Sequence, residues 1–258
     1  MFNGLTRRAL IVALLATPMA ARAADEPAIA AAADLNAVMP EIVALFTQQT
    51  GKTVKLTFGS SGNFTQQIQN GAPFEVFLSA DEAYVRKLQV AGKTEDAGTL
   101  YATGRIGFFQ PNGSQVKAEF PDLAAAVADG RLTRFAIANP EHAPYGRAAQ
   151  EALTHAGLWD AIRPRLVLGE NVAQATQFAT SGAAQGGIIP LSLALTPQVK
   201  AAGTFALIPA DWHQPLRQRA VLLHGAGDTA RAFYAFLQTP AARTILVRYG
   251  FVLPSETS

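Results

Sequence analysis

The sequence predicts an α/β protein with two lobes, and three observations support this fold class. After Pro27, short apolar segments alternate with amphipathic segments of helical period, which is the pattern of parallel strands covered by helices. A single sheet holding all of the ~10 predicted strands would be long for this chain. The last strand and two helices exceed what a second lobe needs, so we expect them to return to the first lobe.

The segment from Pro27 to Ala91 predicts three β–α units. Its first helix places Leu35, Met39, Ile42, Val43 and Phe46 on one apolar face. Gly51 ends that helix, and Gly71-Ala72-Pro73 ends the next one. The expected strands and helices alternate over residues 29–33, 35–50, 54–58, 63–70, 74–78 and 81–91.

A second series of the same kind follows from residue 106. We expect its strands at 106–110, 135–138, 166–168 and 187–189, and its helices at 123–129, 145–157 and 172–182. The chain then passes through 205–208 to a late strand at 220–224 and two closing helices at 229–238 and 241–249. The predicted domains are a first lobe of residues 24–104 plus 215–258 and a second lobe of residues 105–214. In such a fold a ligand binds in the cleft between the lobes.

The first 23 residues have the pattern of a secretory signal peptide. Arg7 and Arg8 precede the apolar run Ala9–Ala16, and small residues end at Ala21-Arg22-Ala23. The arginine pair fits a twin-arginine signal as well as the general secretory route. Because the chain has no cysteine for lipid attachment, we expect a periplasmic protein without a lipid anchor.

Composition and motifs exclude several classes of function. The three arginines of the predicted signal belong to a total of 21 basic residues, so 18 remain against 19 acidic ones, and a nucleic-acid partner is not indicated. The absence of cysteine excludes thiol catalysis and cysteine metal sites. No H-E-x-x-H motif occurs. Gly225–Ala230 matches G-x-G-x-x-A, but no acidic residue lies between Asp228 and Glu256, so we interpret it as a turn.

Polar residues gather where the predicted helices begin. They are Asp34, the Ser60-Ser61-Gly62 turn, Tyr145 and the pair Asn171-Val172. Helix N-termini carry unpaired N–H donors and a partial positive charge, so they bind anions without a lysine or arginine. Taken singly, Asp34 and the serines would be ordinary helix caps, and Tyr145 and Val172 would be core residues.

Four segments, in this order and spacing, resemble the periplasmic molybdate-binding proteins of ABC transporters, the ModA family. They are Ala31–Leu35, Phe58–Gly62, Asn70–Asp81 and Asn139–Gly146, and Tyr249-Gly250-Phe251 resembles the end of those proteins. The resemblance implies a type II periplasmic-binding fold with mixed sheets and a cleft that closes on molybdate or tungstate. It also implies a monomer without a cofactor that serves an inner-membrane permease.

The resemblance also suggests ligand-binding residues. Ser61 matches a serine that holds one oxygen of the anion, Val172 matches a backbone donor, and Tyr145 matches a hydroxyl donor found in one branch of the family. Ser60, Gly62 and Asn171 would support them. These groups hydrogen-bond the oxyanion, and none coordinates the metal atom directly.

Asp34 departs from the family pattern, which has Ser or Asn at this ligand-binding position. An ionised carboxylate ~4 Å from an anionic charge costs about 4 kcal/mol at an effective dielectric constant of 20. Asp34 could turn away and cap its helix, could be protonated and donate, or could indicate another ligand. Two alternatives to molybdate capture therefore stay open. One is a binding protein for a ligand whose cationic group meets Asp34, and the other is a secreted serine hydrolase that uses Ser61 with His142.

Overall fold

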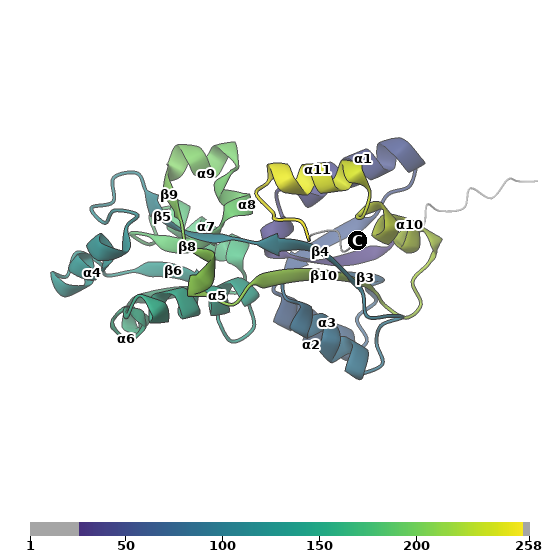
Figure 1. The fold of residues 1–258 in the computed structure, drawn as a ribbon, viewed down its shortest axis with the longest axis horizontal. Helices are drawn as coiled ribbons and strands as arrows, with labels where there is room; N and C mark the ends of the chain where they lie inside the picture. The colour runs from purple at the N-terminus through teal and green to yellow at the C-terminus, as the bar shows by residue number, and fades with distance from the viewer. Residues whose placement is uncertain (1–25, 255–258) are drawn as a thin grey trace, which may run out of the picture.

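A computed structural model describes residues 26–254 and contains two five-stranded mixed sheets, each flanked by helices (Figure 1). The first sheet has the order β2-β1-β3-β10-β4. Strand β1 runs parallel to β2 and β3, whereas β10 runs antiparallel to β3 and β4. The strands are β1 (Ala28–Ala32), β2 (Lys55–Gly59), β3 (Val76–Ser79), β4 (Thr99–Gly104) and β10 (Leu216–Leu222).

The second sheet repeats this arrangement in the order β7-β6-β8-β5-β9. Strand β6 is parallel to β7 and β8, and β5 is antiparallel to β8 and β9. Its strands are β5 (Ile106–Pro111), β6 (Phe135–Ala138), β7 (Leu166–Gly169), β8 (Gly187–Pro190) and β9 (Gly203–Leu207). The predicted fold class, two mixed sheets flanked by helices, is therefore confirmed.

The chain passes between the two sheets twice. It leaves the first sheet after Gly104, enters the second at Ile106, and returns between Leu207 and Leu216. Strand β10 lies between β3 and β4, so the closing part of the chain completes the first sheet. The exact lobe boundaries at residues 104 and 214 stay a prediction.

Helices cover both faces of the first sheet. The helices α1 (Met39–Thr50), α10 (Asp228–Phe236) and α11 (Pro240–Arg248) lie on one face, and α2 (Ser61–Gln69) and α3 (Glu82–Val90) lie on the other (Figure 1). Phe46 of α1 meets Phe233 and Phe236 edge-on, with ring centroids 5.3 and 5.4 Å apart. These aromatic contacts join α1 to α10, the helix that follows β10.

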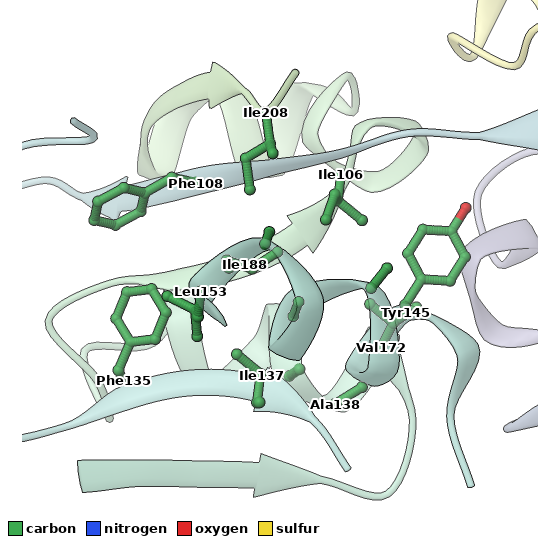
Figure 2. Close-up of a cluster of buried hydrophobic side chains, with 14 of the residues drawn as sticks. Ile106, Phe108, Phe135, Ile137, Ala138, Tyr145, Leu153, Val172, Ile188 and Ile208 are labelled. Atoms are coloured by element: carbon green, nitrogen blue, oxygen red, sulfur yellow. The ribbon is translucent and has the colours of Figure 1, made fainter. Parts of the chain in front are cut away.

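Helices cover the second sheet in the same way. They are α4 (Phe120–Ala128), α5 (Pro144–His155), α6 (Trp159–Ile162), α7 (Val172–Thr180), α8 (Leu191–Ala194) and α9 (Pro197–Ala202). Figure 2 shows the main apolar cluster of this lobe, with Tyr145 at its edge and the tyrosine hydroxyl directed out of the cluster. The cluster includes Ala32, Ala33 and Ala80 from the first lobe, so apolar packing continues across the boundary between the sheets.

Several segments differ from the sequence predictions, among them the short helices α6, α8 and α9, which were not predicted. The helix predicted from Leu35 is instead a 3-10 turn, η1 (Ala33–Leu35), and the α-helix begins at Met39, because Pro40 fits the first helical turn. Strand β4 was not predicted. Strand β10 begins four residues before the predicted strand, and the prediction missed this half because three polar residues follow one another at 217–219. No helix within residues 26–254 is long and apolar enough to cross a membrane, and the predicted signal segment lies outside the described residues.

Candidate functional site

A small pocket lies between the two sheets, where strands of both lobes end and helices begin. The space inside it, counted out to the solvent at its mouth, is about 190 Å³. Within the described part of the chain, its walls combine apolar and neutral polar residues with a single carboxylate and contain no lysine or arginine. The lining residues are Ala32, Ala33, Asp34, Gly59, Ser60, Ser61, Ala80, Ala143, Pro144, Tyr145, Asn171 and Val172.

Two helices of nine residues begin at this pocket, one from each lobe. Ser60 caps α2 by accepting the Asn63 N–H at 3.3 Å, and Asn171 caps α7 by accepting the N–H groups of Ala173 and Gln174. Among the described hydrogen bonds, the N–H groups of Ser61 and Val172, the first residues of the two helices, have no acceptor. Both residues line the pocket, so each helix offers it one backbone donor.

The hydroxyl of Ser61 is held in place by the neighbouring strand end. Its Oγ accepts the Ala80 N–H at 3.0 Å, and Ser61 is fully buried. Because a hydroxyl that accepts a bond keeps its own proton, Ser61 can still donate to a bound anion. The residue therefore combines a backbone donor and a side-chain donor at one wall of the pocket.

Tyr145 and Asp34 meet across the boundary between the lobes. The Tyr145 hydroxyl, on α5, donates to Asp34 Oδ2 at 3.0 Å. Gln218 Nε2, on β10, donates to the same oxygen at 2.6 Å and to the Tyr145 hydroxyl at 3.1 Å. Tyr101 on β4 donates its hydroxyl to Gln218 Oε1 at 2.7 Å. All four residues are at most 3% exposed, so this is a buried network.

Burial dominates the electrostatics of this network. It raises the pKa of Asp34 from 3.8 to about 6, although the bonds from Gln218 and Tyr145 act in the opposite direction. Burial, followed by the nearby Asp34 carboxyl, also holds the pKa of Tyr145 and of Tyr101 well above 10. The two phenols therefore stay neutral, and Asp34 is the network member that titrates near neutral pH.

Asp34 does not act as the helix cap that the sequence suggested. It lies inside η1, whose N-cap is Ala32, and no side chain caps this turn. One carboxylate oxygen points to Gln218 and Tyr145, while Oδ1 has no hydrogen-bond partner among residues 26–254. The expectation that Asp34 caps its helix is therefore wrong, and the residue instead forms part of the pocket wall.

The supporting residues take different places. Ser60 Oγ lies 3.0 Å from His142 Nδ1 of the other lobe, in addition to capping α2. Gly62 does not line the pocket, and its N–H donates to the His142 carbonyl at 2.9 Å. A Cβ on Gly62 would lie 2.5 Å from that carbonyl oxygen, so the glycine permits a close approach of the two lobes. His142 thus contacts Ser60 and not Ser61, and the hydrolase alternative has no serine–histidine pair at Ser61.

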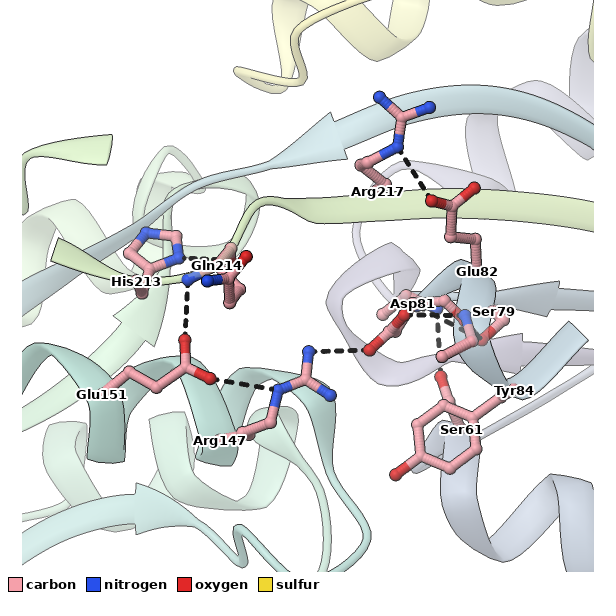
Figure 3. A network of polar contacts seen from close by, with 12 residues as sticks. Ser61, Ser79, Asp81, Glu82, Tyr84, Arg147, Glu151, His213, Gln214 and Arg217 are labelled. Atoms are coloured by element: carbon pink, nitrogen blue, oxygen red, sulfur yellow. Dashed lines mark hydrogen bonds and ion pairs between the residues drawn. The ribbon is translucent and has the colours of Figure 1, made fainter. Parts of the chain in front are cut away.

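An ion pair also crosses between the lobes beside the pocket (Figure 3). Asp81 caps α3 of the first lobe, and its Oδ2 lies 2.7 Å from Arg147 Nη2 on α5. The Arg147 guanidinium also lies 3.4 Å from Glu151. Together with the Ser192 hydroxyl, which donates to the Asp34 carbonyl at 2.7 Å, these contacts hold the lobes against each other.

Gln218 and Tyr101 were missed from the sequence. A signal for Gln218 exists, because Leu216, Gln218 and Ala220 point to the same face of β10 and the two flanking residues are apolar. A polar residue at the middle of such a face predicts a buried hydrogen-bonding side chain. Tyr101 lies on the strand that was not predicted. Within residues 26–254 no group of three His, Cys, Asp or Glu side chains could hold a bare metal ion.

Comparisons with known proteins agree with this architecture. The family described as bacterial extracellular solute-binding protein matches residues 28–252. The molybdate-binding protein ModA of Rhodobacter capsulatus is 39% identical over 252 residues, which cover 96% of this chain and 95% of that protein. ModA of Azotobacter vinelandii is 37% identical and covers 95% of this chain and 97% of its own.

A solved structure of a molybdate-binding protein has the same fold as this chain. The periplasmic molybdate-binding protein of Azotobacter vinelandii superposes with a TM-score of 0.79 at 32% identity, covering 89% of this chain and 100% of that one. The family match spans both sheets and every residue of the pocket. The chain therefore belongs to the bacterial extracellular solute-binding proteins and, within them, to the ModA family.

Proposed function

We propose that this protein captures molybdate or tungstate in the pocket between its lobes and delivers the anion to an ABC permease. The observation that carries the proposal is the meeting of two helix N-termini, α2 and α7, at a pocket without a cationic side chain. The names of the relatives supply the identity of the ligand.

The contacts proposed for the anion come from both lobes. Ser61 offers its hydroxyl and its N–H from the first lobe, and the Val172 N–H comes from the second. Tyr145 and Asp34 form the wall between them, and Asn171 supports the site by holding the start of α7. Neutral donors fixed on helices stabilise an oxyanion without the desolvation cost of a buried lysine or arginine.

Binding would favour the closed arrangement of the lobes. Only when the lobes are together do Ser61 and Val172 lie at one pocket, so an anion that contacts both shifts the population toward that state. The closed form would be the one that the permease recognises. We further propose that the protein acts as a periplasmic monomer, exported by the signal at residues 1–23 through the Sec or the twin-arginine route, and needs no cofactor.

Calorimetric titration tests this function. We expect one-to-one binding of molybdate and tungstate to the purified protein at pH 6, and no heat from sulfate or phosphate at the same concentrations. Pocket size supplies the discrimination, because donors fixed on rigid helices cannot follow a smaller anion. Absence of heat from all four anions would contradict the proposed function, as would a preference for sulfate.

A further inference from the structure

The buried network fixes which oxygen of Asp34 can carry a proton. The Tyr101 hydroxyl donates to Gln218 Oε1, which orients the amide so that Nε2 faces Asp34. Oδ2 then receives two donors, the Gln218 amide and the Tyr145 hydroxyl. An oxygen that accepts two hydrogen bonds is a poor place for a proton, so a protonated Asp34 carries it on Oδ1.

Oδ1 is also the oxygen left for the pocket. Asp34 is fully buried and lines the pocket, and Oδ1 has no partner among the described residues. A buried and unpaired charged oxygen is costly, whereas a buried O–H that meets an acceptor is not. A bound oxyanion would supply that acceptor.

Resting on the proposed function, we infer that Asp34 donates a proton on Oδ1 to the bound oxyanion, so that one proton is taken up with each anion captured. No covalent bond forms or breaks in this step. A proton from solvent binds the carboxylate, the neutral carboxyl donates a hydrogen bond to an anion oxygen, and both leave when the lobes open. The protein is thus a receptor for an anion together with a proton.

Among residues 26–254 no cationic side chain pairs with Asp34, because Arg147 on α5 pairs with Asp81, and Arg217 and Arg219 on β10 pair with Glu82. The phenol of Tyr145 bonds Asp34 directly and that of Tyr101 reaches it through Gln218, and both phenols stay neutral. Helices α7 and α8, packed against η1, carry no titratable side chain, and Lys55, the only one on β2, pairs at the opposite end of β1. The pKa of Asp34 is raised to about 6, so a bound anion that favours the neutral carboxyl can shift Asp34 to its protonated form near neutral pH.

The proton can be counted in the wild-type protein. Titrations with molybdate at a fixed pH of 7.5, in buffers of different ionisation enthalpy, measure the protons taken up per anion. We expect about one proton, and an affinity that falls about tenfold for each pH unit between pH 7 and pH 9. Binding with no proton uptake and no pH dependence would overturn the inference while leaving the proposed function intact.

Two variants locate the proton. Asp34→Asn keeps an acceptor toward Gln218 and Tyr145 and places an amide donor toward the pocket, so it imitates the protonated acid without titrating. We expect its affinity to be independent of pH and roughly 100-fold tighter than that of the wild type at pH 8. His142→Gln is the matched control, because it replaces an ionisable side chain that contacts Ser60 of the pocket wall.

The outcomes separate the two claims. The inference holds if Asp34→Asn removes the pH dependence and His142→Gln keeps it, and it fails if the two variants behave the other way round. If neither the wild type nor Asp34→Asn binds molybdate or tungstate anywhere between pH 5.5 and pH 9, the proposed function itself fails.

Discussion

Tyr145 belongs to two parts of the molecule at once. Its ring packs in the apolar cluster of the second lobe, and its hydroxyl bonds Asp34 of the first lobe. A substitution that removes only the oxygen therefore tests the site without emptying the core. This separation makes Tyr145 the most informative single residue of the pocket wall.

We expect Tyr145→Phe to weaken molybdate binding more than about tenfold at pH 5.5, where the neutral form of Asp34 predominates. The loss corresponds to about 1.4 kcal/mol, the size of one buried hydrogen bond. Calorimetric titration gives the affinity, and circular dichroism during heating checks that the fold is intact. An unchanged affinity would remove Tyr145 from the site.

A second prediction about Asp34 concerns the stability of the protein without ligand. Its pKa is raised in the folded protein, so the folded state binds the extra proton between about pH 4 and pH 6. The stabilisation from the neutral form is fully present below the unfolded pKa of 3.8 and is lost as the pH rises through about 6. The change from 3.8 to about 6 corresponds to roughly 3 kcal/mol.

Asp34→Asn should therefore unfold at a higher urea concentration than the wild type at pH 7.5, and the difference should shrink toward pH 4. Comparing the two proteins at each pH cancels the titration of other carboxylates, such as Glu82. Burial raises the pKa of Glu82, but the hydrogen bonds from Arg219 and Arg217 outweigh it and lower the pKa. If the wild type is as stable as the variant or more stable at pH 7.5, burying the ionised carboxylate does not destabilise the folded protein.

At the scale of elements, strong periodicity and helix punctuation made much of the fold predictable. Gly51 ends α1 with a φ of +69°, a backbone conformation that favours glycine, and the sequence placed the helix end there. The start of α1 was misplaced because the apolar face of the helix extends back to Leu35, whereas Pro40 marks the first turn.

The candidate site was predictable only in part. Helix starts are visible in sequence, so Ser61, Tyr145 and Val172 could be named, and the structure brings all three to one pocket. The pattern of β10 could mark Gln218 as buried, but the link between Gln218 and Tyr101 could not be predicted, because it depends on β10 lying beside β4, a pairing between segments more than 100 residues apart. Local sequence patterns do not show which distant strands pair. The contribution of all these residues to ligand binding stays a prediction.

The contact between α3 and α5 carries the prediction at this scale. Arg147 and Asp81 join the lobes, and the arginine side chain is 36% exposed. A half-exposed pair stabilises the closed state by up to about 1 kcal/mol, so we expect Arg147→Gln to weaken molybdate binding by about two- to fivefold at low salt. The difference should disappear at high salt.

Arg131→Gln is the control for this prediction. Arg131 pairs with Asp122 and Asp129 inside the second lobe, at 3.5 and 2.7 Å, so its loss removes an ion pair of similar exposure without touching the other lobe. Calorimetric titration of both variants at two salt concentrations separates the effects. Equal losses of affinity would mean that the Arg147 pair has no special role in closure.

At the scale of the whole molecule, the two crossings of the chain make the pocket depend on both sheets. The carboxyl ends of β1 and β2 supply Ala32 and Gly59 to its wall, while α5 and α7 of the second lobe supply Tyr145 and Val172. Neither lobe alone contains the site. A ligand bound there stabilises the folded state of both lobes together, since unfolding either one releases it.

This linkage predicts how the anion changes the thermal unfolding of the protein. At a molybdate concentration 100 times the Kd, binding adds about 2.7 kcal/mol to the free energy of unfolding. For a protein of this size we expect Tm to rise by about 5–10 °C in one cooperative transition at pH 6. Differential scanning calorimetry measures both the shift and the number of transitions, with sulfate as the control anion. A shift confined to one of two separate transitions would mean that the anion binds within one lobe, and the pocket between the sheets would then not be its site.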